Sequence, residues 1–142
     1  MPAFRYILAP LDFSSKCERT LQAVQQLATP GETRVCLMHV VEGGPHAEDD
    51  RLIAFYKGLE ESARRKIAAI SVPLRELGLE VTECVATGRP ARLIIDEAQR
   101  SGADLLVLSS HPLGDGVQDV QHWATVSYQA AIFCRCPVLL VK

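Results

Sequence analysis

Short apolar runs alternate with segments of helical periodicity along the whole chain, and this alternation restricts the folds open to it. Five runs have the length and composition of buried strands: Arg5 to Leu11, Arg34 to Val41, Leu79 to Ala86, Asp104 to Ser109 and Pro137 to Val141. Strands separated by helices form right-handed crossovers, which build a mostly parallel sheet with helices on both faces. The sequence therefore predicts a three-layer α/β fold, and its 142 residues with 48% hydrophobic content suit one domain over 1–142.

The segments between these runs carry helix signals. Ser15 and Glu18 have the spacing of a capping box at the start of the first helix. In the second and longest helix, Pro73 should kink or divide the last turns, and Gly78 is a plausible cap. Its apolar residues recur every three or four positions and predict one continuous buried stripe: Leu52, Phe55, Tyr56, Leu59, Ala63, Ile67, Ile70, Leu74 and Leu77. Pro90 suits the first turn of the third helix. The fourth is expected from Val117 to Phe133 with five residues inward: Val120, Trp123, Ala124, Ser127 and Ala131.

Charge and composition argue against several classes of partner. A formal net charge of -2 provides no general attraction to nucleic acid or to anionic membranes. The apolar runs are too short to span a bilayer, and the first residues lack a signal-peptide pattern. Five irregularly spaced cysteines do not suggest a disulfide framework. We therefore expect a cytoplasmic protein with reduced thiols and no nucleic-acid or membrane partner.

Parallel α/β sheets bind ligands outside the carboxyl ends of their strands, where strand order reverses. Asp12 follows the first strand, Gly88 the third, and Ser109 and Ser110 end the fourth. The Asp12 carboxylate could accept hydrogen bonds from a ligand or cap the following helix, and the sequence leaves both roles open. The loop after Ser110 has small residues that could approach an anion, but Pro112 removes a donor there, and a plain connecting loop is the simpler interpretation.

No Ser, His and acid set suggests itself near these strand ends, so the residue chemistry does not support catalysis. His39 lies inside an apolar strand and is expected to be a core histidine with a satisfied ring nitrogen. Cys134 and Cys136 straddle Arg135 just before the last strand, with one side chain expected to face inward and the other outward. A metal or redox role for this cysteine pair is a minor alternative.

Five motifs resemble the universal stress protein family along almost the whole chain: ILAPLDFSS, LMHVVE, TGRPARLIIDEA, DLLVLSSH and CPVLLVK. Their order and spacing are more specific than any one of them. The resemblance implies a five-stranded parallel sheet of order 3-2-1-4-5, a homodimer built through the last strand over 137–141, and cytoplasmic expression under stress or growth arrest. Pairing of that apolar strand with its symmetry mate would also satisfy backbone groups at an exposed sheet edge.

One branch of that family binds ATP, and the resemblance carries some of its positions to this chain. Asp12, with Pro10 and Leu11 beside it, corresponds to the acidic residue that contacts the nucleoside, and Val40 to the position whose backbone reads adenine. The phosphate loop of that branch has the form G-x2-G-x9-G-[ST]. Here Ser109, Pro112 and Ala124 replace its three glycines, with about two extra residues between, and Thr125 retains the hydroxyl.

Glycine lets the backbone pass close to phosphates, whereas a Cβ or a proline ring occupies that space. The departure predicts a non-enzymatic stress-response interaction or signalling module with a degenerate nucleotide crevice, no required cofactor and an unidentified protein partner. The alternative is an ATP-binding switch, with or without slow hydrolysis, whose rearranged loop holds the phosphates. That loop would use Ser109, Ser110, Gly114, Gly116 and Thr125. A third alternative is a redox-responsive protein that works through Cys134 and Cys136.

Overall fold

The computed structural model describes residues 1–43, 49–110 and 118–142, the side chains of 118–125 excepted. Strands and helices alternate in it as β1 (Tyr6–Pro10), α1 (Cys17–Leu27), β2 (Arg34–Glu42), α2 (Asp50–Glu76), β3 (Glu80–Gly88), α3 (Pro90–Ser101), β4 (Leu105–Ser109), α4 (Gln118–Phe133) and β5 (Val138–Val141). The strands form one sheet of order β3-β2-β1-β4-β5, in which all paired neighbours are parallel. The predicted single-domain fold and strand order are confirmed.

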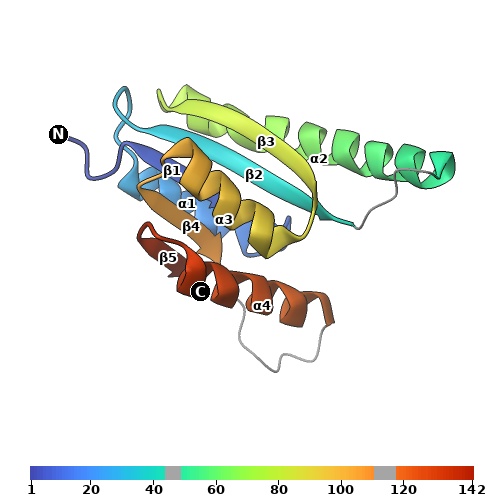
Figure 1. The fold of residues 1–142 in the computed structure, drawn as a ribbon. Coiled ribbons are helices and arrows are strands. Elements are labelled where there is room, and N and C mark those ends of the chain that lie inside the picture. The colour runs from blue at the N-terminus through green and yellow to red at the C-terminus, as the bar shows by residue number, and fades with distance from the viewer. Residues whose placement is uncertain (44–48, 111–117) are drawn as a thin grey trace.

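The sheet is the middle of three layers (Figure 1). One core joins the sheet to α1 and α2, and includes Ile7 from β1. The other joins it to α3 and α4, and includes the next residue, Leu8. Because successive side chains of a strand point to opposite faces, the central strands must be apolar at every position. This requirement explains why their sequences read as unbroken apolar runs.

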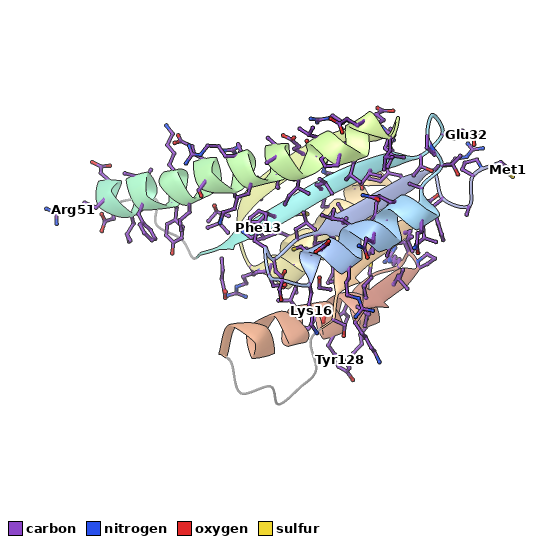
Figure 2. The ribbon with its side chains drawn as sticks, turned by 180° about the vertical axis from the view of Figure 1, so that it is seen from behind. Met1, Phe13, Lys16, Glu32, Arg51 and Tyr128 are labelled. Atoms are coloured by element: carbon purple, nitrogen blue, oxygen red, sulfur yellow. The ribbon has the colours of Figure 1, made fainter. Side chains whose placement is uncertain are left out.

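The stripe predicted along α2 is buried only in its second half. Ala63, Ile67 and Leu74 are buried there, together with the polar Ser71. A 27-residue helix is about 40 Å long, whereas the nine-residue strands beneath it span roughly 30 Å. The first turns of α2 therefore extend beyond the sheet (Figures 1 and 2), and the prediction is wrong for four residues that are exposed: Leu52, Phe55, Leu59 and, at the other end, Leu77.

The carboxyl end of α2 shows how the chain turns into β3. The helix continues through Pro73, so the proline does not divide it. Gly78 has φ +86°, its N–H donates to the Arg75 carbonyl, and the Leu79 N–H donates to the Leu74 carbonyl. These two bonds form a Schellman motif, in which glycine takes the left-handed conformation that a Cβ disfavours. The predicted role of Gly78 at this helix end is confirmed.

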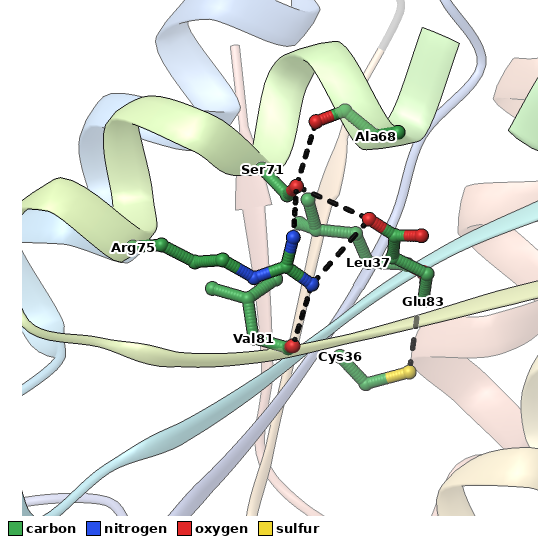
Figure 3. A network of polar contacts seen from close by, with 7 residues as sticks. All are labelled: Cys36, Leu37, Ala68, Ser71, Arg75, Val81 and Glu83. Atoms are coloured by element: carbon green, nitrogen blue, oxygen red, sulfur yellow. Dashed lines mark hydrogen bonds and ion pairs between the residues drawn. The ribbon is translucent and has the colours of Figure 1, made fainter. Parts of the chain in front are cut away.

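A polar network then fixes the last turns of α2 to the edge strand β3 (Figure 3). The Arg75 guanidinium donates to Ser71 Oγ at 2.9 Å and to the Val81 carbonyl at 3.0 Å. Glu83 Oε1 accepts from Ser71 Oγ at 3.1 Å and lies 3.4 Å from Arg75 Nη2. These bonds satisfy a buried hydroxyl and one carbonyl of the strand, so α2 can close on β3 over a polar contact.

On the opposite face, α4 turns slightly differently from the prediction. Ala130 is fully buried and Ala131 is exposed, so Ala131 was wrongly expected to face inward, while Ser127 is buried as predicted. Val120, Trp123 and Ala124 lie outside the residues with described side chains. No helix among the described residues has the length and hydropathy needed to cross a membrane.

Candidate ligand site at the carboxyl ends of the strands

The order of strands reverses between β1 and β4. From β1 the chain proceeds outward to β2 and β3, and it then returns to the other side of β1 to form β4 and β5. Asp12 lies two residues after β1, and Ser110 directly follows β4. The structure therefore brings these two predicted site residues to the position where open α/β sheets hold ligands.

Asp12 organises the turn between β1 and α1. Its Oδ1 accepts from the Ser14 N–H at 3.0 Å and from the Cys17 thiol at 3.4 Å. Burial, followed by the charge of Asp12, raises the pKa of Cys17 to about 11. The helix begins at Cys17 with Lys16 as its N-cap and without a side-chain cap, so the predicted capping box of Ser15 and Glu18 is wrong. The turn takes its place because Asp12 and Ser14 bond the backbone amides before the helix.

Lys16 reaches from the start of α1 to the end of β4, where its Nζ donates to the Ser110 carbonyl at 3.1 Å (Figure 2). The sequence reasoning missed this residue. A helix N-terminus carries partial positive charge and disfavours a lysine, so its presence there was a usable signal of a contact elsewhere. The cation lies at the same sheet edge as the Asp12 carboxylate, so this edge has both signs of charge.

Ser109 is buried at the end of β4. Its Oγ lies 2.7 Å from Thr20 Oγ1, and both side chains are inaccessible to solvent. Thr20 also donates to the Lys16 carbonyl at 3.3 Å. With the Lys16 to Ser110 bond, the Thr20 to Ser109 bond joins the start of α1 to the end of β4 at two adjacent points.

Phe13 and His39 form an aromatic pair next to Asp12. Their rings stack at 4.2 Å, and Lys66 Nζ lies 5.1 Å from the Phe13 ring. Phe13 has φ +59°, a left-handed conformation that is rare for a bulky residue and costs roughly 1–2 kcal/mol. His39 Nδ1 bonds the Leu11 carbonyl at 2.6 Å, which confirms the expectation of a satisfied ring nitrogen. Burial lowers the pKa of His39.

The other candidate positions lie along the same edge. Pro10 ends β1, Leu11 donates its N–H to the Met38 carbonyl, and Val40 is buried within β2. At the end of β3, the Gly88 carbonyl accepts from the Gly43 N–H, and a Cβ on Gly88 would lie 2.8 Å from Leu93 Cδ1. Pro112, Gly114 and Gly116 lie outside the described residues, as do the side chains of Ala124 and Thr125.

The hydroxyls of Thr20 and Ser109 are buried against one another. The same sheet edge also holds the Asp12 carboxylate, the Lys16 ammonium and the Ser110 hydroxyl. Such groups can bind a polar ligand by charge and hydrogen bonding. Across 1–43, 49–110 and 118–142, no group of three or more His, Cys, Asp and Glu side chains could hold a metal ion.

Comparisons with known proteins place this arrangement in one family. The model of the universal stress protein family matches residues 3–142. Universal stress protein MJ0577 from Methanocaldococcus jannaschii is 26% identical over 125 residues, which cover 76% of this chain and 77% of that protein. Universal stress protein YxiE from Bacillus subtilis is 26% identical over an alignment of 156 positions, which covers 98% of this chain and 99% of that protein.

Solved structures agree with the fold described above. The structure of MJ0577 aligns with a TM-score of 0.80 at 27% identity, and covers 97% of this chain and 95% of its own. A universal stress protein from Archaeoglobus fulgidus in complex with dAMP aligns with a TM-score of 0.68 at 19% identity, with both chains fully covered. At that identity the second likeness concerns the fold alone.

Proposed function

This chain belongs to the universal stress protein family, and from that premise we propose that it is a non-enzymatic, homodimeric stress-response module that acts through protein contacts. Its nucleotide crevice is degenerate in this proposal, and no cofactor is required. The cytoplasmic location and the unidentified protein partner expected from the sequence belong to the same proposal.

The observation that carries this proposal is the environment of Ser109. In the ATP-binding branch a glycine stands at this position and leaves room for phosphates. Here a side chain occupies the position, is buried, and is hydrogen-bonded to Thr20 at 2.7 Å. Moving it aside would break a buried hydrogen bond, at a cost of about 1–3 kcal/mol before any contact with a ligand. The Lys16 to Ser110 bond ties the same two elements and would resist the same opening.

The far edge of the sheet supports the homodimer. β5 pairs with β4 on one side, and within the described residues it is the last strand of the sheet. Four large hydrophobic residues of α4 and β5 are exposed nearby: Tyr128, Ile132, Phe133 and Leu139. Tyr128 points away from the body of the protein in Figure 2. An apolar surface beside an open strand edge suits a second copy of the same chain, which would cover both.

The second candidate is the ATP-binding switch. It is favoured by Lys16 and Asp12, since an ammonium and a carboxylate at the strand-order reversal could contact phosphate and ribose respectively. Relatives of the same fold include a universal stress protein in complex with cAMP and the Archaeoglobus fulgidus protein in complex with dAMP. Those names describe ligands of those proteins, and transfer of nucleotide binding to this chain is the hypothesis under test.

Thermal unfolding in the presence of ATP and magnesium separates the two candidates. A ligand at 100 times its dissociation constant stabilises the folded state by about 2.7 kcal/mol. For a chain of this size that is a rise in melting temperature of roughly 10 °C. The proposed function expects no saturable rise at millimolar ATP, together with a dimer mass by light scattering.

A variant with three glycines restored provides the matched control. Ser109→Gly, Pro112→Gly and Ala124→Gly together remove the side-chain atoms that distinguish this loop from that of the ATP-binding branch. We expect this variant to gain stabilisation by ATP that the parent lacks. A saturable rise in the parent itself would contradict the degenerate crevice and favour the switch, and a monomeric mass would contradict the homodimer.

A further inference from the structure

Two thiols lie side by side where α4 leads into β5. The Sγ atoms of Cys134 and Cys136 are 3.4 Å apart, and both residues are partly buried. The expectation that one faces inward and the other outward is therefore wrong. The pair lies before the first residue of β5, in a segment that bends around Arg135, so the alternation of a strand does not apply to it.

A cavity of about 290 Å³ opens beside these sulfur atoms. Both cysteines line it, together with Ala98 and Gln99 of α3 and with Arg135. Arg135 is exposed and places a permanent positive charge at the cavity. The cavity can therefore admit a small anionic molecule to the thiols, whereas Cys17 and Cys36 are buried in the two cores.

We propose that Cys134 and Cys136 are a redox-active dithiol, which a small carboxylate-bearing disulfide oxidises to an intrachain disulfide. The sulfur of Cys134 attacks one sulfur of the small disulfide, forms a mixed disulfide and expels the first small thiolate. The sulfur of Cys136 then attacks Cys134 Sγ and expels the second. The two protons of the cysteines end on the two small thiols, so the small disulfide is reduced as the protein is oxidised.

The order of attack follows from the surroundings of the two sulfurs. Burial, and then the adjacent Cys134 sulfur, raises the pKa of Cys136. A raised pKa disfavours the thiolate of Cys136, so we assign the first attack to Cys134. The sulfurs are near enough that side-chain rotation can bring them to the ~2.05 Å of a disulfide bond.

Oxidation of the folded full-length protein with glutathione disulfide tests the proposal. The titratable thiols, counted after unfolding, should fall from five to three and return to five with dithiothreitol. Trypsin cleaves after Arg135, so the disulfide should appear as two linked peptides, each with one cysteine, in the oxidised sample only. Cys136→Ser should lose one of its four thiols and stop at a mixed disulfide with glutathione, whereas Cys134→Ser, which lacks the first nucleophile, should keep its four thiols.

Cys84→Ser is the matched control, because Cys84 is also partly buried but lies on β3 in a different part of the sheet. This variant should fall from four thiols to two, since it retains the proposed pair. A wild-type protein that keeps five thiols would overturn the inference. So would linked peptides that join Cys36 to Cys84, or serine variants that still lose two thiols.

Discussion

The hydrogen bond between Thr20 and Ser109 should be measurable as a coupling free energy. Thr20→Val and Ser109→Ala each remove one hydroxyl from a pair whose oxygens are 2.7 Å apart and buried. A neutral hydrogen bond contributes about 1 kcal/mol, and a buried partner left without it adds to the cost. We therefore expect each single variant to lose about 1–2 kcal/mol of unfolding free energy, or roughly 4–8 °C in melting temperature.

The double variant should lose less than the sum of the two single variants. Once one hydroxyl is gone, removal of the other no longer breaks the bond between Thr20 and Ser109, so a coupling of about 1 kcal/mol is expected. Urea unfolding followed by circular dichroism, at one fixed protein concentration, gives the four free energies of the cycle. Ser15→Ala serves as the control: this serine is exposed in the turn between β1 and α1, and its loss should change the free energy of unfolding by less than about 0.5 kcal/mol.

Additivity of the two variants within about 0.3 kcal/mol would refute the reasoning. It would mean that the two hydroxyls do not stabilise one another, and that Ser109 can move aside without the cost assumed for the closed crevice. Nucleotide binding would then be compatible with a serine at position 109. Unequal denaturant slopes would show instead that a variant had altered the unfolded state or the cooperativity of unfolding.

Three further predictions concern other parts of the molecule. Burial lowers the pKa of His39 in the folded state, so its contribution to stability is present above about pH 6.5 and is lost as pH falls toward the folded-state pKa. His39→Gln should flatten this decline in the free energy of unfolding, measured with urea between about pH 7 and pH 5.5, and an unchanged pH profile would contradict the prediction. The carbonyls of Pro137 and Val141 bond β4, so the Leu140 N–H faces the open edge of β5. Light scattering should therefore show monomers or aggregates for Leu140→Pro and a dimer for Leu140→Val, and a dimeric proline variant would count against this interface. Arg75→Met removes the donors to Ser71 and to the Val81 carbonyl and should lower the free energy of unfolding by about 1 kcal/mol. Adding Glu83→Gln should lower it little further, and urea unfolding of the single and the double variant checks this.

The layers of the fold could be predicted because a strand buried on both faces has apolar residues at successive positions of the sequence. β1 and β4 read as unbroken apolar runs since each is covered on both sides, and their alternation with helices sets the topology. Periodicity could not predict how far α2 extends. The pattern of Leu52, Phe55 and Leu59 is the same whether a sheet lies beneath the helix or has already ended, and only the lengths of helix and strands decide the matter.

The positions of the site residues were easier to predict than their contacts. That Asp12 and Ser110 would lie together follows from strand topology, but the bond from Lys16 to Ser110 joins residues 94 positions apart and depends on the path of one side chain. The left-handed conformation of Phe13 has no local signal, because a bulky aromatic residue is disfavoured there and surrounding contacts must impose it. The proximity of Cys134 and Cys136 required the bend between them, which a strand pattern does not report.

The structure also changes the meaning of the serine at position 109. In the sequence Ser109 is one of three residues that stand where the ATP-binding branch has glycines. In the structure its hydroxyl is one half of a buried pair, because Thr20 supplies the polar partner that a hydroxyl in this position needs. Ser109→Gly by itself would leave the Thr20 hydroxyl buried, with the Lys16 carbonyl at 3.3 Å as its acceptor. We therefore expect the single change to reduce stability without improving nucleotide binding, so that a gain of binding would require the other two glycines of the triple variant as well.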